Sequence, residues 1–201
     1  MSELATIGWA EALPTANLLS ADDWMALPED RWRYEVVSGH LVRLPAADLR
    51  YDLIASDLLR TLGTFVLAQG LGKVTLPDTG FLVSLPEEQD TVVVPAVAFV
   101  RSEHLPSEQA AQAMTYLRLV PDLVVEIAAP GQQRPMLAEK TALWLAAGVR
   151  LVWVVWPNRR QVEVSILADG VPSMQTLSAH ELLDGGAVVP GFSCLVAHLF
   201  L

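Results

Sequence analysis

Residues 121–130 read PDLVVEIAAP, an apolar run with a single carboxylate, Glu126, near its middle. Alternate side chains of a strand share one face, so Glu126 lies on the same face as Val124 and Ala128. Both faces are apolar apart from Glu126, which predicts a central strand of a sheet that is covered on both sides. A buried carboxylate without a partner is costly. A metal ion, a lysine or water therefore has to stand opposite Glu126.

A helix over residues 135–147, in the stretch PMLAEKTALWLAAG, follows this strand after a short loop. Its apolar side chains recur at intervals of three and four, and Lys140 falls on the same stripe as Leu137 and Trp144. Because that stripe has to pack on the sheet, we expect Lys140 to point inward and meet Glu126. Two alternatives stay open: Lys140 extends to the rim of the sheet and to water, or its ion pair with Glu126 is purely structural.

The remaining sequence alternates between helical and strand-like patterns. A short helix capped by Ser20 precedes two strand-like runs around Ser38–Gly39, which is a tight-hairpin signal. Apolar residues then recur at helical spacing from Asp48 to Gln69, and the helix ends at Gly70. Further strands are predicted at 72–76, 79–85, 91–100, 150–157 and 161–167, with a short helix at 107–116.

This mixture predicts an α/β fold with a mixed β-sheet flanked by helices and an N-terminal hairpin and helix. We expect an N-terminal arm at residues 1–18 and a single domain at 19–201. No apolar run reaches the roughly 18 residues of a membrane span, and no signal peptide is recognised. Cys194 is the only cysteine, which excludes an internal disulfide and a multi-cysteine zinc site. We therefore expect a cytoplasmic protein without a membrane partner.

The charge of the chain bears on its partners. Its 201 residues carry a net charge of −10. Proteins that bind duplex DNA gain much of their affinity from Lys and Arg contacts with phosphates, so a broad DNA-binding face is not expected. A local basic groove stays possible, although the arginines, Arg33 among them, are scattered along the chain.

Five stretches in order resemble the Uma-two-type family of predicted restriction endonucleases, within the PD-(D/E)XK nuclease superfamily: YEVVSGHLV, VVVPAVAFV, PDLVVEIAAP, EKTALWLAAGVRLVWVVWP and LLDGGAVVPGF. The resemblance covers residues 20 to 200. It implies a restriction-endonuclease-like core, a hydrolase that cleaves DNA, and often a homodimer. In the superfamily, an aspartate and a glutamate on neighbouring strands hold Mg²⁺. The metal and a lysine activate water and stabilise charge on the phosphate.

The resemblance assigns a role to several residues. Glu126 corresponds to the metal-binding glutamate, Lys140 to a catalytic lysine moved onto the following helix, and Glu35 to a glutamate of the first hairpin. The family pattern PDVAFV reads PAVAFV here, so Ala96 stands in place of the metal-binding aspartate. Asp90 lies roughly 20 Å from Ala96 if the chain between them is extended. One carboxylate and a lysine hold Mg²⁺ poorly.

Smaller departures from the family pattern accompany Ala96. The hairpin pattern DGEL reads SGHL, with Ser38 and His40, and Tyr51 stands where a histidine is typical. His40 could replace a carboxylate as a metal ligand, but an exposed histidine beside the turn is favoured. Trp32 and Trp156 could stack on bases, but core packing is favoured for both. The other histidines are isolated, and Cys194 is expected in the core.

Three hypotheses remain at this point. The first is an active Mg²⁺-dependent DNA endonuclease that acts through Glu126 and Lys140. The second is a protein with a nuclease-like fold and a degenerate metal site, with weak or no nuclease activity, which serves in binding or assembly. The third is a structural or regulatory homodimer unrelated to nucleic acid. Ala96 and the acidic charge favour the second and third, whereas Glu35, Glu126 and Lys140 keep the first open.

Overall fold

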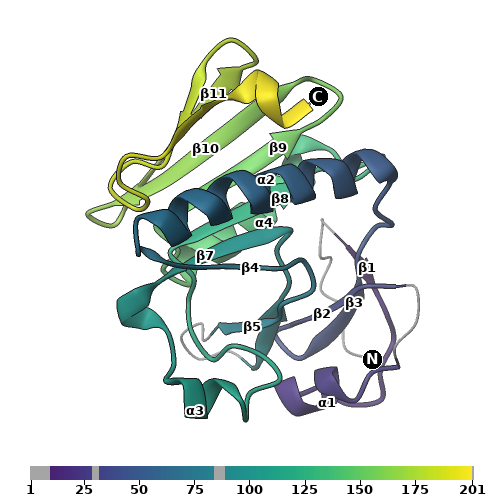
Figure 1. The fold of residues 1–201 in the computed structure, drawn as a ribbon. Helices are drawn as coiled ribbons and strands as arrows, with labels where there is room; N and C mark the ends of the chain where they lie inside the picture. The colour runs from purple at the N-terminus through teal and green to yellow at the C-terminus, as the bar shows by residue number, and fades with distance from the viewer. Residues whose placement is uncertain (1–9, 29–31, 84–88, 201) are drawn as a thin grey trace.

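The computed structural model describes residues 10–28, 32–83 and 89–200. It has an α/β fold in which helices flank a mixed sheet, as predicted (Figure 1). Residues 1–9 of the predicted arm, and 84 and 85 of a predicted strand, lie outside the described residues. The helices are α1 (Ala21–Met25), α2 (Leu49–Ala68), α3 (Glu108–Ala111) and α4 (Arg134–Ala146), with 3-10 turns η1 (Ser102–His104) and η2 (Val196–Phe200).

The larger sheet has six strands in the order β11-β10-β9-β8-β7-β4. Its strands are β4 (Gly72–Thr75), β7 (Val97–Arg101), β8 (Leu123–Ile127), β9 (Leu151–Trp156), β10 (Gln161–Ala168) and β11 (Val171–Ser178). β8 and β9 run parallel and are joined by α4, while the other neighbours run antiparallel. β8, which carries Glu126, lies in the interior of this sheet, as its apolar pattern predicts.

A second sheet has five antiparallel strands in the order β1-β3-β2-β6-β5. Its strands are β1 (Glu11–Ala12), β2 (Tyr34–Val37), β3 (His40–Arg43), β5 (Phe81–Val83) and β6 (Thr91–Val93). The predicted hairpin joins β2 to β3, with positive φ angles at both Ser38 and Gly39, the geometry of a type I′ turn. Near the C-terminus, β12 (Leu182–Asp184) pairs with β13 (Ser193–Leu195).

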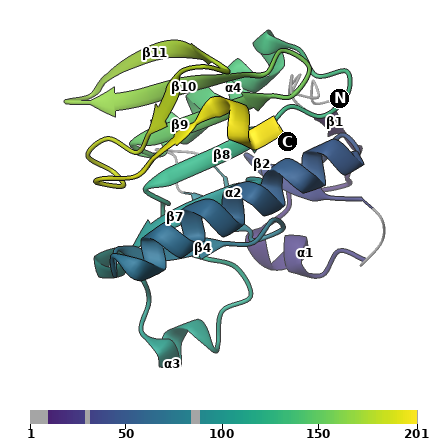
Figure 2. The same cartoon turned by 45° about the horizontal axis from the view of Figure 1, so that its top comes forward.

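The larger sheet is covered on both faces. Figures 1 and 2 show α2 lying along one face, where it packs with the C-terminal segment. α4 and the smaller sheet cover the other face, which carries Val124 and Glu126. α2 starts at Asp48, whose side chain accepts from the Tyr51 N–H, and ends before Gly70 with its positive φ. None of the helices in the described segments is long and apolar enough to cross a membrane.

The predicted strand at 91–100 is wrong in one respect, because two strands occupy this stretch. β6 belongs to the smaller sheet and β7 to the larger one, and the chain crosses between them at Val94–Ala96. Pro95 lacks an N–H and cannot continue a ladder in the middle of a sheet. This crossing brings the two sheets together beside Glu126.

Two other differences concern exposed segments. The predicted helix at 107–116 is shorter, because α3 ends at Ala111. β11 was not predicted, since its sequence VPSMQTLS is exposed over most of its length and lacks an apolar alternation.

Candidate functional site

Glu126 is bound by two residues of α4. It is 5% exposed, and its Oε1 accepts from Lys140 Nζ at 2.9 Å and from Trp144 Nε1 at 2.8 Å. Lys140 and Trp144 are four residues apart and therefore lie on the same face of the helix. The predicted inward orientation of Lys140 is confirmed, and the alternative in which it extends to water is wrong, because Lys140 is 2% exposed.

Glu35 completes the cluster from the smaller sheet. It is fully buried on β2, and its Oε1 accepts from Lys140 Nζ at 2.8 Å and from the Val94 N–H at 2.7 Å. Lys140 also donates to the Val94 carbonyl at 3.2 Å. An ammonium has three N–H donors, and three acceptors surround this one. We call Glu35, Glu126 and Lys140 the Lys140 cluster. It ties together both sheets, α4 and the crossing between β6 and β7.

The charges of the Lys140 cluster depend on one another. Burial raises the pKa of Glu126, and Glu35 raises it further, while Lys140 and Trp144 pull it down. Burial alone would lower the pKa of Lys140, but the carboxylates of Glu126 and Glu35 outweigh this effect and raise it. Lys140 is therefore a protonated cation near neutral pH. It supplies the positive charge that a buried carboxylate needs.

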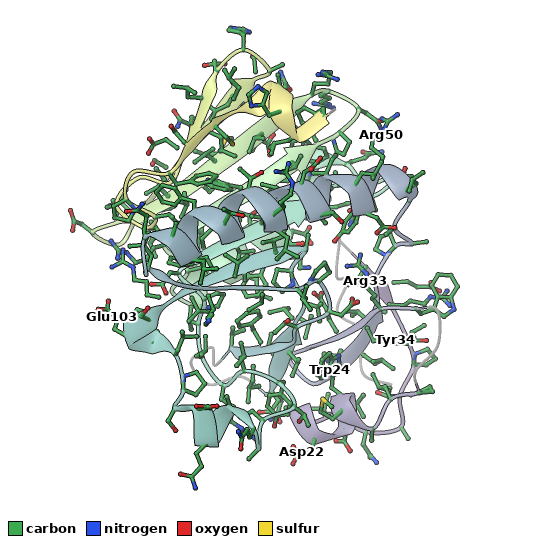
Figure 3. All side chains as sticks on the ribbon, viewed as in Figure 1. Asp22, Trp24, Arg33, Tyr34, Arg50 and Glu103 are labelled. Carbon is green, nitrogen blue, oxygen red and sulfur yellow. The ribbon has the colours of Figure 1, made fainter. Side chains whose placement is uncertain are left out.

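Arg33 places a second cation at the edge of the Lys140 cluster. Its guanidinium donates to the Tyr51 hydroxyl at 3.0 Å and lies over the Tyr51 ring, and Figure 3 shows it between α2 and the β2–β3 hairpin. Burial would lower the pKa of Arg33, but Tyr51, Asp78 and Glu126 raise it. Sequence reasoning missed Arg33, because nothing in its local pattern separates it from the other scattered arginines.

A small cavity separates Arg33 from the Lys140 cluster. It measures about 20 Å³ and is lined by Arg33, Tyr51, Glu126 and Lys140, among others. This volume is enough for about one water molecule. Two cations, Arg33 and Lys140, and two carboxylates, Glu35 and Glu126, therefore balance in charge around this cavity without a divalent metal.

Ala96 lies beside the Glu126 strand, just before β7. β7 and β8 pair with Val97 opposite Val125 and Ala98 opposite Val124. The regular ladder ends there, because the Ala96 N–H donates to the Val125 carbonyl at 3.0 Å. Ala96 is fully buried, and it packs in the cluster that includes α2, whereas Glu126 lies on the face covered by α4 and the smaller sheet. Ala96 is therefore close to Glu126 along the two strands, but its side chain packs on the α2 side.

The Lys140 cluster does not fit a divalent metal as it stands. Mg²⁺ takes carboxylate, phosphate and water oxygens in a near-octahedral shell. Here Glu35 and Glu126 each direct Oε1 to Lys140 Nζ, and position 96 offers no third carboxylate. Within residues 10–28, 32–83 and 89–200, no group of three or more His, Cys, Asp or Glu side chains is arranged to hold a metal ion.

Other residues singled out in the sequence lie elsewhere or act structurally. Asp90 accepts from the Ala21 N–H at the start of α1 at 2.9 Å, so it does not substitute for the missing aspartate. His40 is half-buried at the start of β3 rather than exposed. Trp156 is buried in the core, as the sequence analysis expected, and Trp32 is half-buried under the Arg43 guanidinium. Cys194 packs against the core, and burial raises the pKa of its thiol to about 11.

A second buried carboxylate, Asp122, lies directly before β8. It is 3% exposed, and its Oδ2 accepts from the Arg101 N–H and contacts His104 Nδ1, both at 2.9 Å. Arg101 Nε lies 3.5 Å from its Oδ1. We call Asp122, Arg101 and His104 the Asp122 cluster. No sequence signal connects His104 to Asp122, 18 residues away.

The fold is similar to that of a solved nuclease-like α/β structure. A similar solved structure is described as a "putative nuclease belonging to DUF820" from Anabaena variabilis. It aligns with a TM-score of 0.76 and 17% sequence identity, over 90% of this chain and 97% of that one. At this identity the likeness concerns the fold.

The family assignment comes from the sequence. The Uma2 family, described as "Putative restriction endonuclease", matches residues 21–197, and the chain belongs to this family. This confirms the resemblance drawn from the five sequence stretches. Among curated protein sequences, none matches this chain.

Proposed function

We propose that this protein is a member of the Uma2 family whose metal centre has been replaced by an internal ion-pair cluster, and that it serves in binding or assembly instead of cleaving phosphodiesters. One observation carries the proposal: Lys140 Nζ lies 2.8 Å from Glu35 and 2.9 Å from Glu126, and the neighbouring chain segment has an alanine at position 96. In a nuclease of this kind the lysine would assist a metal ion. In this protein Lys140 occupies the place of the metal ion.

The energetics of burial support this assignment. Removing one partner of a buried ion pair costs about 3–5 kcal/mol, because the remaining charge is left without compensation. Lys140 and Trp144 both contact Oε1 of Glu126, so Mg²⁺ would have to bind Oε2, and its double positive charge would then lie close to the buried Lys140 ammonium. Only a strong set of oxygen ligands could offset this cost. With Ala96 in the third position, the chain supplies two carboxylates that are already engaged.

The alternative is an active Mg²⁺-dependent DNA endonuclease that acts through Glu126 and Lys140. One observation favours it: the cavity beside Glu126 is lined by Arg33 and Tyr51, which donate hydrogen bonds and could contact a phosphate. DNA is the substrate class that the family description suggests. This alternative requires a metal ion to enter the cavity of about 20 Å³ beside Glu126, whereas a phosphate could occupy the pocket of about 230 Å³ that shares Arg33 and Tyr51 with it.

Calorimetric titration with Mg²⁺ and Mn²⁺, followed by cleavage assays on single- and double-stranded DNA, tests the proposal. We expect neither metal-binding heat nor metal-dependent cleavage. The matched variants are Glu126→Gln, which removes the buried carboxylate, and Glu139→Gln, which changes an exposed glutamate of the same helix. Metal-dependent cleavage that Glu126→Gln abolishes and Glu139→Gln preserves would refute the proposal and establish the endonuclease.

Binding of DNA without cleavage is a separate question. The net charge of −10 opposes it, and Arg33 and Arg43 already contact Tyr51 and Glu11. Affinity built on phosphate contacts falls steeply as salt rises. We therefore expect no salt-dependent gel shift with single- or double-stranded DNA. A shift that weakens with salt and is lost in Arg33→Gln would instead assign the assembly role to nucleic acid.

A further inference from the structure

A larger pocket shares Arg33 and Tyr51 with the small cavity beside Glu126. Its volume is about 230 Å³, and none of the three residues of the Lys140 cluster lines it. Pockets that hold drug-sized ligands measure about 300–1,000 Å³. This pocket therefore suits a smaller molecule, and the charges of its walls restrict which one.

Arg33 is a half-buried cation in the wall of this pocket. Its Nη1 donates to the Tyr51 hydroxyl at 3.0 Å, and the guanidinium lies over the Tyr51 ring, so its position is fixed. Within residues 10–28, 32–83 and 89–200, no carboxylate forms an ion pair with Arg33, whereas Arg43 pairs with Glu11. A guanidinium has five N–H donors, and two adjacent ones bind a carboxylate bidentately. Arg33 therefore has donors to spare for the carboxylate of a ligand.

Two exposed aspartates line the same pocket. Asp52 belongs to the first turn of α2, and Asp78 lies in the turn between β4 and β5. Neither carboxylate forms an ion pair with another described residue, although Asp78 is close enough to raise the pKa of Arg33. One cation and two anions in the walls disfavour a dianion such as phosphate. They favour a ligand that carries a carboxylate and its own cation.

The rest of the pocket is apolar. Among the described residues, no charged side chain other than those of Arg33, Asp52 and Asp78 lines it. An apolar group of the ligand can therefore be buried next to the charged ones, as in most small-molecule sites. The apolar and aromatic walls, apart from Tyr51, are Trp32, Leu44, Pro45, Ala46, Ala47 and Pro77.

We propose that this pocket binds a free α-amino acid with an apolar side chain. The carboxylate of the amino acid binds the Arg33 guanidinium, and its ammonium lies between the carboxylates of Asp52 and Asp78. Its side chain packs against the apolar walls. This inference goes beyond the proposed function, and a result for or against a metal ion at the Lys140 cluster leaves it unchanged.

Isothermal titration calorimetry of the full chain with L-alanine, L-valine, L-leucine, L-methionine and L-phenylalanine, at constant ionic strength, tests the ligand class. We expect saturable binding of at least one of them. Its N-acetyl derivative lacks the ammonium and its amide lacks the carboxylate, so each should raise the dissociation constant tenfold or more. Inorganic phosphate should also bind at least tenfold more weakly.

Two results of these titrations would overturn the proposal. One is the absence of saturable binding for all five amino acids. The other is an N-acetyl derivative or inorganic phosphate that binds as tightly as the amino acid, which would make Arg33 a site for simple anions, the phosphates of a nucleic acid included.

Variants of the pocket test the assigned contacts. Asp78→Asn removes a charge and should raise the dissociation constant fivefold or more, and asparagine tolerates the positive φ of this position. Asp169→Asn is the matched control, because Asp169 is also exposed in a turn with positive φ but does not line the pocket, and it should bind like the wild type. Arg33→Lys keeps the charge but loses the bidentate geometry, so it should weaken binding tenfold or more.

Thermal unfolding without ligand checks that the variants fold. If Arg33→Lys does not fold, Asp78→Asn and the ligand derivatives still decide the question. Binding by Asp78→Asn that equals that of the wild type and of Asp169→Asn would overturn the proposal.

Discussion

Two buried carboxylate clusters lie at different depths of the same sheet. In the Lys140 cluster, Glu35, Glu126 and Lys140 are each at most 5% exposed, and their partners come from both sheets and α4. In the Asp122 cluster, Asp122 is 3% exposed, but the side chains of Arg101 and His104 are 25% and 49% exposed. The side chains of the Lys140 cluster are almost fully buried, whereas Arg101 and His104 of the Asp122 cluster are partly exposed to solvent.

This difference in exposure predicts how much stability is lost when one partner of each cluster is removed. Water can solvate a partly exposed charged side chain after its carboxylate is removed, so the loss of stability is small. Water cannot solvate a cation or carboxylate that stays buried in the core, so the loss is large. We therefore expect the Lys140 cluster to hold the two sheets together and the Asp122 cluster to secure only the strand end beside η1.

Lys140→Met should produce the largest effect. It leaves Glu35 and Glu126 buried without their cation, and we expect a loss of about 3–5 kcal/mol in the free energy of unfolding near neutral pH. Urea unfolding measures this loss. Lys73→Met is the matched control, since Lys73 is the only other lysine and is exposed on β4. A loss of less than about 1 kcal/mol for Lys140→Met would show that the buried Lys140 cluster contributes no more stability than an exposed ion pair.

The same variant predicts a dependence on pH. Without the ammonium, burial and Glu35 raise the pKa of Glu126 further above its ordinary 4.5. A carboxyl group with a raised pKa in the folded state contributes stability that is full below the unfolded pKa and is lost as pH rises through the folded one. In the wild type, the raised pKa of Lys140 keeps its contribution full below 10.5. The stability gap between the two proteins should therefore widen from pH 5 to pH 8.

The Lys140 cluster was only partly predictable from the sequence. The helical stripe of α4 put Lys140 on the face that packs on the sheet, and the apolar flanks of Glu126 marked a buried charge. Those two local patterns were enough to pair them. Glu35 entered only through the family resemblance, because its approach depends on how the two sheets pack. Arg33 carried no local signal at all, and its place beside Glu126 is set by tertiary structure.

In the fold, too, the features with local sequence signals were predicted and those set by long-range contacts were missed. α2 was predicted from Asp48 to Gln69 because apolar spacing and the glycine at the C-terminal end are local signals, and the structure places it at Leu49–Ala68. The division of residues 91–100 between two sheets was missed, although Pro95 marked the break. β11 was missed because an exposed edge strand has no face to bury and therefore no alternation in its sequence. Sheet membership depends on contacts far apart in the chain, which periodicity does not encode.

Ala96→Asp tests whether a carboxylate at the position of the missing aspartate can build a metal site next to the Lys140 cluster. Ala96 is fully buried against β8, and we expect a loss of about 2–3 kcal/mol in the free energy of unfolding without metal, because the added carboxylate is buried without a partner. If position 96 completes a metal site, Mn²⁺ or Mg²⁺ should restore part of this stability, since a ligand that binds only the folded state stabilises it. Thermal unfolding with and without metal measures both effects.

Ala98→Asp is the matched control for that experiment. Ala98 is also fully buried on β7, but it faces Val124 instead of Glu126. It should lose stability without any recovery on addition of metal. Equal behaviour of the two variants, with no metal effect in either, would show that Glu35, Glu126 and Lys140 cannot be converted to a metal site by one aspartate.

Asp122→Asn should have the smallest effect of the three. The amide oxygen still accepts from the Arg101 N–H, and the partly exposed side chains of Arg101 and His104 can turn to water, so we expect a loss of about 1–2 kcal/mol in the free energy of unfolding at neutral pH. Asp57→Asn, in an exposed pair with Arg60, should cost at most about 0.5 kcal/mol. If Asp122→Asn destabilises the protein as much as Lys140→Met, access of the partner cations to water does not set the cost, and the two clusters are equivalent supports of the sheet.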